Sequence, residues 1–157
     1  ALPRPKMLRR CLAMTAELGI KQLYLVNSYR VEKSYWQSPL LTPGEIRRCL
    51  LEGLEQAKDT RLPRVEIRKR FKPFVEDELS ALLRGRQGLV AHPYTGTAGE
   101  LVLPLQQPAL ICIGPEGGFI PYEVEKLLAA GCLPLDLGER IYRVETVLPL
   151  LVGRLFQ

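Results

Sequence analysis

Three short segments in the second half of the chain carry residues that could bind a ligand or move a proton. Each directly follows an apolar run typical of a buried parallel strand. In an open parallel sheet, ligands bind beyond the carboxyl ends of the strands, where the following loops converge. The sequence therefore predicts one site built from three loops, which are His92-Pro93-Tyr94, Gly114-Pro115-Glu116-Gly117-Gly118 and Gly138-Glu139-Arg140-Ile141-Tyr142-Arg143.

The glycine-rich loop does not match the usual phosphate-binding patterns. It lacks the closing Lys-Ser/Thr of a P-loop and the G-x-G-x-x-G order of a dinucleotide fingerprint. Gly117 and Gly118 would instead let the backbone approach a flat ligand closely and offer it main-chain donors and acceptors. The alternative is one tight turn in which Glu116 is an ordinary surface residue.

These loops need a scaffold, and the hydrophobic pattern predicts one. Short apolar runs alternate with segments at helical spacing, which indicates an α/β protein with a mainly parallel sheet. Thr42, Pro43 and Glu45 predict a helix that begins with a capping box. Pro149 is awkward inside the last helix unless it lies in a first turn capped by Thr146. The predicted helices span 7–18, 43–57, 73–83, 121–130 and 144–155, and the predicted strands 20–26, 65–67, 89–91, 109–113 and 133–137.

Length and composition describe one soluble globular domain of 157 residues, 46% of them hydrophobic. No apolar run approaches the roughly 18 residues of a membrane span. The basic segment 1–10 is not followed by the apolar stretch of a secretory signal, so a cytoplasmic location is expected. Four widely spaced cysteines are interpreted as buried thiols, and a single histidine argues against a multi-histidine metal centre, so no metal is expected.

Positive charge is concentrated in the first half of the chain. Residues 1–80 carry a net charge of +6, and residues 81–157 carry −1. A basic half favours a polyanionic partner such as RNA, because neutralised phosphates release counterions. A merely solvated basic surface explains the charge equally well. The candidate RNA contacts after the first predicted strand are Ser28, Arg30 and Lys33, with the basic run 68–72 and the aromatic residues Tyr29, Tyr35 and Trp36 nearby.

Several motifs together resemble the ribosomal RNA small-subunit methyltransferase E family, uridine N3 methyltransferases of the SPOUT superfamily. Ile113-Gly-Pro-Glu-Gly-Gly-Phe119 is similar to that family's glycine-rich segment. Leu137-Gly-Glu-Arg-Ile-Tyr-Arg-Val-Glu-Thr146 is similar to its Leu-Gly-x-Arg-Ile-Leu-Arg-x-Glu-Thr segment. Upstream, Thr15-Ala-Glu-Leu-Gly19, Ser28-x-Arg30 and Leu54-Glu-Gln56 match further motifs in the family's order, so the resemblance covers nearly the whole chain.

The resemblance implies a SPOUT-type parallel sheet flanked by helices, with a deep trefoil knot towards the carboxyl end. It implies S-adenosyl-L-methionine as methyl donor, small-subunit ribosomal RNA as substrate, and a homodimer. Residues 1–157 would form the methyltransferase domain, without the family's PUA-like amino-terminal RNA-binding domain. The cofactor-binding residues it implies are Ala91, His92, Ile113, Gly114, Pro115, Glu116, Gly117, Gly118, Leu137, Gly138, Ile141, Tyr142 and Val144.

The same resemblance implies separate roles for the cofactor and the protein in catalysis. The sulfonium of the cofactor already activates the methyl group, so the protein must align a uridine nitrogen with it. Arg143 is expected to stabilise negative charge on the uracil oxygens, and Glu145 to orient Arg143 or accept the proton. The alternative is an ion pair of Arg143 with Glu145 or Glu116 that only fixes a loop. Two other functions remain open, a non-catalytic RNA-binding or ribosome-assembly module and a methyltransferase with another target nucleotide.

Overall fold

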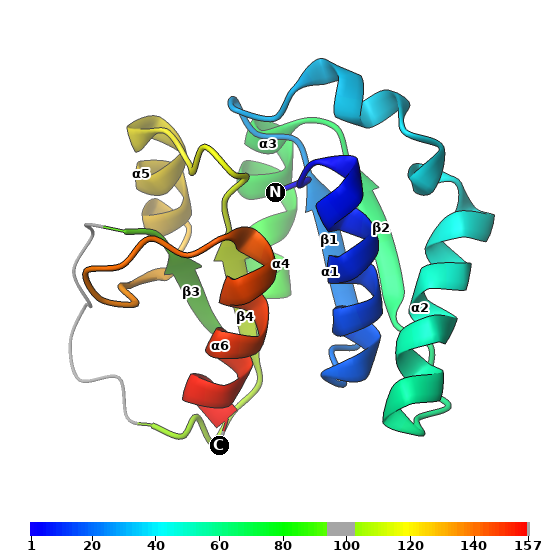
Figure 1. Cartoon of the computed structure of the whole chain (residues 1–157). Helices are drawn as coiled ribbons and strands as arrows, with labels where there is room; N and C mark the ends of the chain where they lie inside the picture. Colours follow the sequence, from blue (N-terminus) through cyan, green and yellow to red (C-terminus); the bar gives the residue numbers. More distant parts are fainter. Residues whose placement is uncertain (94–102, 157) are drawn as a thin grey trace.

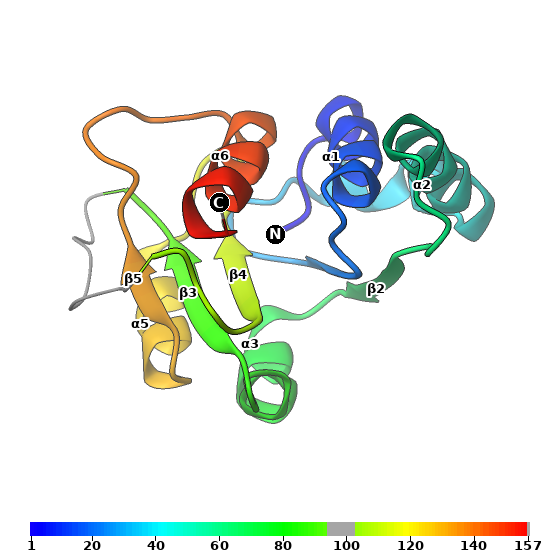
Figure 2. The same ribbon diagram turned by 90° about the horizontal axis from the view of Figure 1, so that it is seen from below.

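The computed structural model describes residues 1–93 and 103–156 and confirms the α/β class, since all strand pairs among these residues are parallel. The strands form two sheets whose facing members are β1 and β4 (Figure 1, Figure 2). The prediction of one sheet therefore needs correction, because periodicity places strands along the chain without fixing their neighbours. One sheet pairs β1 (Gln22–Val26) with β2 (Arg64–Arg68), and in the other β3 (Gln87–Ala91) lies between β4 (Ala109–Ile113) and β5 (Leu133–Leu135).

Two amphipathic helices, α1 (Pro5–Glu17) and α2 (Pro43–Ala57), pack on each other and on the β1–β2 sheet (Figure 1). Their buried faces follow the predicted apolar stripes. Gly53 marks their close approach, because a Cβ there would lie 2.0 Å from the carbonyl oxygen of Ala13. The 3₁₀ turns η1 (Lys33–Gln37) and η2 (Pro39–Leu41) connect β1 to α2.

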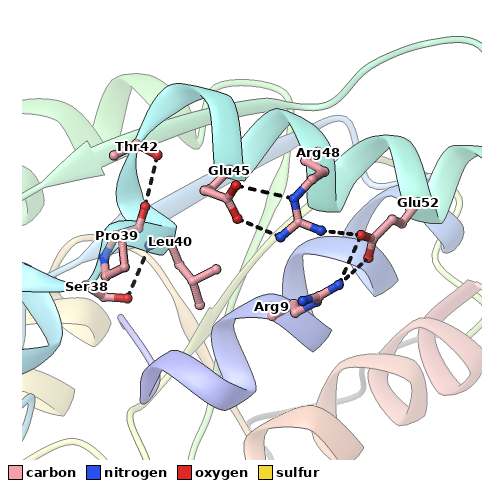
Figure 3. A network of polar contacts seen from close by, with 8 residues as sticks. All are labelled: Arg9, Ser38, Pro39, Leu40, Thr42, Glu45, Arg48 and Glu52. Atoms are coloured by element: carbon pink, nitrogen blue, oxygen red, sulfur yellow. Dashed lines mark hydrogen bonds and ion pairs between the residues drawn. The ribbon is translucent and has the colours of Figure 1, made fainter.

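The capping box predicted for the start of α2 does not form. The Thr42 hydroxyl donates a hydrogen bond back to the carbonyl oxygen of Pro39, 2.9 Å away, and so does not cap the helix (Figure 3). Glu45 turns outward instead and binds the guanidinium of Arg48 at 2.6 Å. Exposed ion pairs are worth roughly 0–1 kcal/mol. The packing of its buried stripe therefore stabilises α2 more than any side-chain cap does.

The helix predicted at 73–83 begins two residues earlier, at Phe71. Pro73 lies in its first turn, where backbone N–H groups have no partner within the helix, so the proline is tolerated without being the first residue. The helix has three consecutive parts, α3 (Phe71–Pro73), a π-helical turn η3 (Phe74–Leu79) and α4 (Ser80–Leu82).

The last two helices precede and follow β5 along the chain. Helix α5 (Pro121–Ala129) starts at its proline as predicted, and Gly131, with a φ of +103°, ends the turn after it. Helix α6 (Val144–Phe156) contains Pro149 in its interior, so the interpretation of Thr146 as its cap is wrong. The ring of Pro149 is exposed, which keeps the defect on the solvent side of the helix.

Alternate residues of β3 face two different cores. Leu89 is buried with Leu151 and Leu155 of α6. Val90 is buried on the opposite face, with residues of η3 and α5 such as Phe74 and Leu127. Burial on both faces is typical of a central strand in a parallel sheet, and β3 is the central strand here. The predicted loops of the site follow the three strands of this sheet.

Candidate functional site

The three predicted loops leave the sheet at one edge. In the strand register, Ala91 lies opposite both Ile113 and Leu135, the last residues of β4 and β5. The N–H group of His92 then donates to the carbonyl oxygen of Leu135, 3.4 Å away. Strands β3, β4 and β5 therefore end side by side, and the three loops leave the sheet from this edge as predicted; Tyr94 lies outside the described residues.

The glycine loop is tightly folded and cannot accept larger side chains without rearrangement. Gly118 has a φ of +71°, and its N–H group donates to the carbonyl oxygen of Pro115 at 2.8 Å. A Cβ at Gly114 would lie 3.0 Å from the backbone nitrogen of Phe119. A Cβ at Gly117 would lie 3.0 Å from Cδ of Arg30. These glycines therefore bring bare backbone to the edge of the sheet.

The loop after β1 is fastened to the glycine loop. The Arg30 guanidinium donates a hydrogen bond to the carbonyl oxygen of Gly117. Glu123 of α5, only 3% exposed, accepts from the N–H groups of Tyr29 at 2.8 Å and Ile120 at 3.0 Å. Sequence reasoning missed Glu123, although an acidic residue in the first turn after Pro121 is typical of a group that binds free N–H groups at a helix start.

His92 is half-buried beside the glycine loop. A Cβ on Gly118 would lie 3.5 Å from its Cε1 atom, and its ring centroid is 6.5 Å from that of Phe119. Burial, followed by the positive charge of Arg30, lowers the pKa of His92 below its usual value. The imidazole is therefore neutral at physiological pH, which suits contact with an uncharged ligand group.

The third loop presents its polar residues to solvent. Gly138 has a φ of +97°, and its N–H group donates to Oδ1 of Asp136 at 2.8 Å. Ile141 is 70% exposed, and Arg143 is exposed as well. The carbonyl oxygen of Arg143 accepts from the N–H groups of Thr146 and Val147 at 2.9 and 3.0 Å, which fixes the start of α6.

Among the described residues, Arg143 forms no ion pair with Glu145 or Glu116. Glu116 instead accepts a hydrogen bond from the backbone N–H of Arg4 at 3.0 Å, and the guanidinium of Arg4 lies 3.8 Å away. The loop-fixing ion pair considered as an alternative for Arg143 is therefore not formed. Arg143 as a whole is exposed to solvent.

A pocket of about 670 Å³ lies at the carboxyl ends of β1 and β2. The hydroxyl of Ser28, 3% exposed overall, has no hydrogen-bond partner among the described residues. Within the basic run, the Arg68 guanidinium is neutralised by Glu66 at 2.7 Å and Glu78 at 2.8 Å, so its charge is not free for RNA. The pocket lining combines lysines with aromatic rings, and includes Lys33, Lys69, Lys72, Tyr29, Trp36, Phe71 and Tyr122.

Two further kinds of feature are absent from residues 1–93 and 103–156. No helix there is both long enough and apolar enough to cross a membrane. No group of three or more His, Cys, Asp or Glu side chains in these ranges could hold a metal ion. All four cysteines are free thiols, and Cys112 is half-buried rather than buried as predicted.

A sequence profile of the RNA methyltransferase domain matches residues 1–155. Ribosomal RNA small subunit methyltransferase E of Treponema pallidum is 33% identical over an alignment of 148 residues. The alignment covers 92% of this chain and 55% of that protein. Ribosomal RNA small subunit methyltransferase E 1 of Borreliella burgdorferi is 24% identical, over 91% of this chain and 59% of that protein. The chain thus spans a little over half the length of these curated relatives.

Solved structures share the fold. A ribosomal RNA small subunit methyltransferase E from Neisseria gonorrhoeae, bound to S-adenosyl methionine, superposes with a TM-score of 0.77 at 18% identity, covering 98% of this chain and 61% of that one. A protein from Legionella pneumophila in complex with the cofactor SAM gives a TM-score of 0.78 at 20% identity, covering 97% of this chain and 61% of that one. Similarity at this level of identity establishes the common α/β architecture.

Proposed function

Since this chain belongs to the RNA methyltransferase domain family, we propose that it transfers a methyl group from S-adenosyl-L-methionine to N3 of a uridine in small-subunit ribosomal RNA. The main observation behind this proposal is that the strands leading into the three loops end side by side, with the glycine-rich turn 114–118 at the end of the β4 strand. The names of the curated relatives support the class of substrate.

The residues at this edge fit the proposed cofactor. Gly114, Gly117 and Gly118 have no side chains, so their backbone would lie against the edge of a flat neutral ring such as adenine; the Gly118 N–H and the Gly117 carbonyl oxygen are already bonded within the protein. The neutral imidazole of His92 and the apolar side chain of Ile141 add uncharged surface. When bound, S-adenosyl-L-methionine supplies a methyl group that its positively charged sulfur already activates. The protein therefore needs to position a nucleophile more than to generate one.

Arg143 and Glu145 are the side chains that we assign to the reacting base. The guanidinium of Arg143, without an ion-pair partner among the described residues, binds the uracil oxygens and stabilises the negative charge that spreads onto them when N3 loses its proton. Glu145 lies in the first turn of α6, two residues further on, and accepts that proton or orients Arg143.

We assign the lysine-lined pocket beside Ser28 to the RNA that flanks the target uridine. Its lysines attract phosphates, and its aromatic rings can stack on unpaired bases. Arg30 belongs to the same loop, but its hydrogen bond to Gly117 gives it a second role in holding the glycine turn. RNA and cofactor would therefore bind on opposite sides of the loop that follows β1.

The homodimer, the trefoil knot and a cytosolic place of action belong to the same proposal. At the carboxyl end, the carbonyl oxygen of Leu155 in α6 accepts from the N–H group of Leu105 at 2.7 Å. A crystal structure of the assembled molecule would test the knot and the dimer together.

The proposed function is tested in two steps. Calorimetric titration with S-adenosyl-L-methionine should give binding in the micromolar range, whereas absence of binding would favour a non-catalytic RNA-binding or assembly module. Mass spectrometry of nucleosides after reaction with unmodified ribosomal RNA should then detect N3-methyluridine. A different methylated nucleoside would keep the enzyme class but replace the target.

A further inference from the structure

The pocket at the carboxyl ends of β1 and β2 combines buried and exposed polar groups of opposite charge. Three segments line it, within 27–36 after β1, 69–72 at the start of α3 and 120–123 at the start of α5. Its volume of about 670 Å³ falls in the range of small-ligand sites. The groups that the chain itself leaves unmatched indicate the chemistry of an occupant.

Two buried side chains of the lining lack hydrogen-bond partners that a ligand could supply. The Ser28 hydroxyl has no partner among the described residues. The Glu123 carboxylate accepts from the N–H groups of Tyr29 and Ile120, but no cation in the described part of the chain forms an ion pair with it. A carboxylate can accept about four hydrogen bonds. Because unmatched polar groups are costly away from water, both side chains favour a ligand with uncharged N–H donors and acceptors.

Three lysines of the same lining require a ligand of negative charge. Lys33, Lys69 and Lys72 are exposed, and none of them forms an ion pair within residues 1–93 and 103–156. Their charge attracts anions. An anion against Glu123, however, would be repelled by the carboxylate. The occupant therefore carries anionic groups for the lysines and an uncharged, hydrogen-bonding part for Ser28 and Glu123.

Aromatic side chains of the lining supply flat surfaces. Trp36, the only tryptophan of the chain, is half-buried, and its indole N–H donates to Oδ1 of Asn27 at 2.8 Å, which restrains the ring. Tyr29 is 79% exposed and Tyr122 is 44% exposed, so both rings are open to a ligand. Such rings stack on the bases of single-stranded nucleic acids. Phosphates, a flat ring and an uncharged polar edge occur together in a nucleotide.

We propose that this pocket binds the base of one unpaired nucleotide, with the base edge against Ser28 and Glu123, the base plane against the aromatic rings, and the neighbouring phosphates on the lysines. The inference rests on the proposed RNA substrate and adds that a base edge is recognised here, and not the backbone alone. In a duplex that edge is already paired. The pocket therefore selects single-stranded RNA or a nucleotide turned out of a helix.

The test compares two RNA probes at the same ionic strength, an octamer of adenosine and an octamer of purine riboside. Purine riboside keeps the ring system but lacks the amino group, so its base has no N–H donor. Binding is followed without cofactor by the quenching of Trp36 fluorescence, which stacking of a base on the indole produces. Because a hydrogen bond to a carboxylate is lost, the purine riboside octamer should bind at least about tenfold more weakly. This pair of probes tests Glu123 without changing its contacts in the protein.

A pair of variants tests the hydroxyl. Ser28→Ala removes it, and Ser34→Ala, at an exposed serine of η1, is the control. Ser28→Ala should weaken the binding of both octamers about threefold to tenfold. Its midpoint of thermal unfolding should stay the same or rise, because a buried hydroxyl without a partner destabilises the free chain. Ser34→Ala should change neither quantity. A lower midpoint in Ser28→Ala together with weaker binding would give Ser28 a structural role and contradict the proposal.

Equal affinity for the two octamers, or equal quenching by a long adenosine–uridine duplex, would overturn the base pocket. Methyl transfer is read separately, as N3-methyluridine. Methylation together with equal affinities would refute the base pocket alone, whereas discrimination between the octamers without methylation would refute the proposed function alone.

Discussion

Arg143 has a structural role in its backbone and a proposed chemical role in its side chain. Its carbonyl oxygen accepts hydrogen bonds from the first turn of α6, while the residue is exposed to solvent. Backbone and side chain can therefore be separated by mutation, because truncation of the side chain leaves the carbonyl oxygen in place.

Replacement of Arg143 by Ala should lower kcat by at least about 10²-fold, since a charge-stabilising donor at the reacting base is lost. The dissociation constant for S-adenosyl-L-methionine should stay within about threefold. Methyl-transfer assays and calorimetry measure the two quantities. Arg140→Ala, an exposed change in the same loop, is the control. Loss of cofactor binding in Arg143→Ala would make Arg143 a loop-structuring residue.

Glu123 is the residue whose loss should loosen the loop after β1. In Glu123→Gln, an amide group faces one of the two N–H groups that the carboxylate now accepts, so a buried donor is left unpaired. We expect the free energy of unfolding to fall by about 1–3 kcal/mol. Denaturant titration measures this, with Glu125→Gln, an exposed neighbour on the same helix, changing it by less than about 0.5 kcal/mol. Equal effects in both variants would contradict the role given to Glu123.

At the scale of elements, α6 contains the clearest conflict between local sequence and observed structure. Pro149 lies inside the helix, where it removes a backbone donor and crowds the preceding turn. The helix persists because Leu151 and Leu155 are fully buried beneath the β3–β5 face. Tertiary packing thus outweighs an unfavourable residue in the helix.

Replacement of Pro149 by Ala should raise the free energy of unfolding by about 1–3 kcal/mol, because the change restores an N–H donor and a strong helix former. Thermal unfolding would show the gain as a higher midpoint. Pro121→Ala, at the first position of α5, should give no such gain, because proline is favourable there. A lower midpoint for Pro149→Ala would mean that the proline itself contributes to the packing of α6.

The limits of most elements could be predicted because proline and glycine mark them. Pro43 and Pro121 begin helices and Gly131 ends one, and each acts through its own backbone geometry. Thr42 failed as a cap because a competing acceptor, the carbonyl oxygen of Pro39, became available only through the preceding 3₁₀ turn. Contacts between distant segments, such as Glu123 with Tyr29 or Arg30 with Gly117, could not be predicted because no local pattern encodes them.

At the scale of the whole molecule, the amino terminus lies between the two sheets. Burial lowers the pKa of the Ala1 amino group from 8.0 to about 6. The nearby carboxylates of Glu123 and Glu116 oppose this effect only in part. The folded chain therefore binds fewer protons at this group than the unfolded chain does between pH 6 and 8.

Stability of the 157-residue chain should accordingly rise from pH 6 to pH 8, by at most about 2–3 kcal/mol from this group. Denaturant titrations at several pH values measure the slope. Acetylation of the amino terminus removes the titrating group and should remove that part of the slope, while any contribution of His92 persists. An unchanged slope after acetylation would show that the amino group does not titrate in this range.

The hydrogen bond from the Arg30 side chain to Gly117 joins the loop beside the proposed RNA pocket to the loop proposed to bind the cofactor. Whichever of these ligands binds first would restrain both loops and so lower the entropic cost of binding the other. Thermodynamic reciprocity then requires each ligand to tighten the other's binding by the same factor. We therefore expect synergy between an RNA oligonucleotide and S-adenosyl-L-methionine, equal in both orders of addition, as a consequence of this one hydrogen bond.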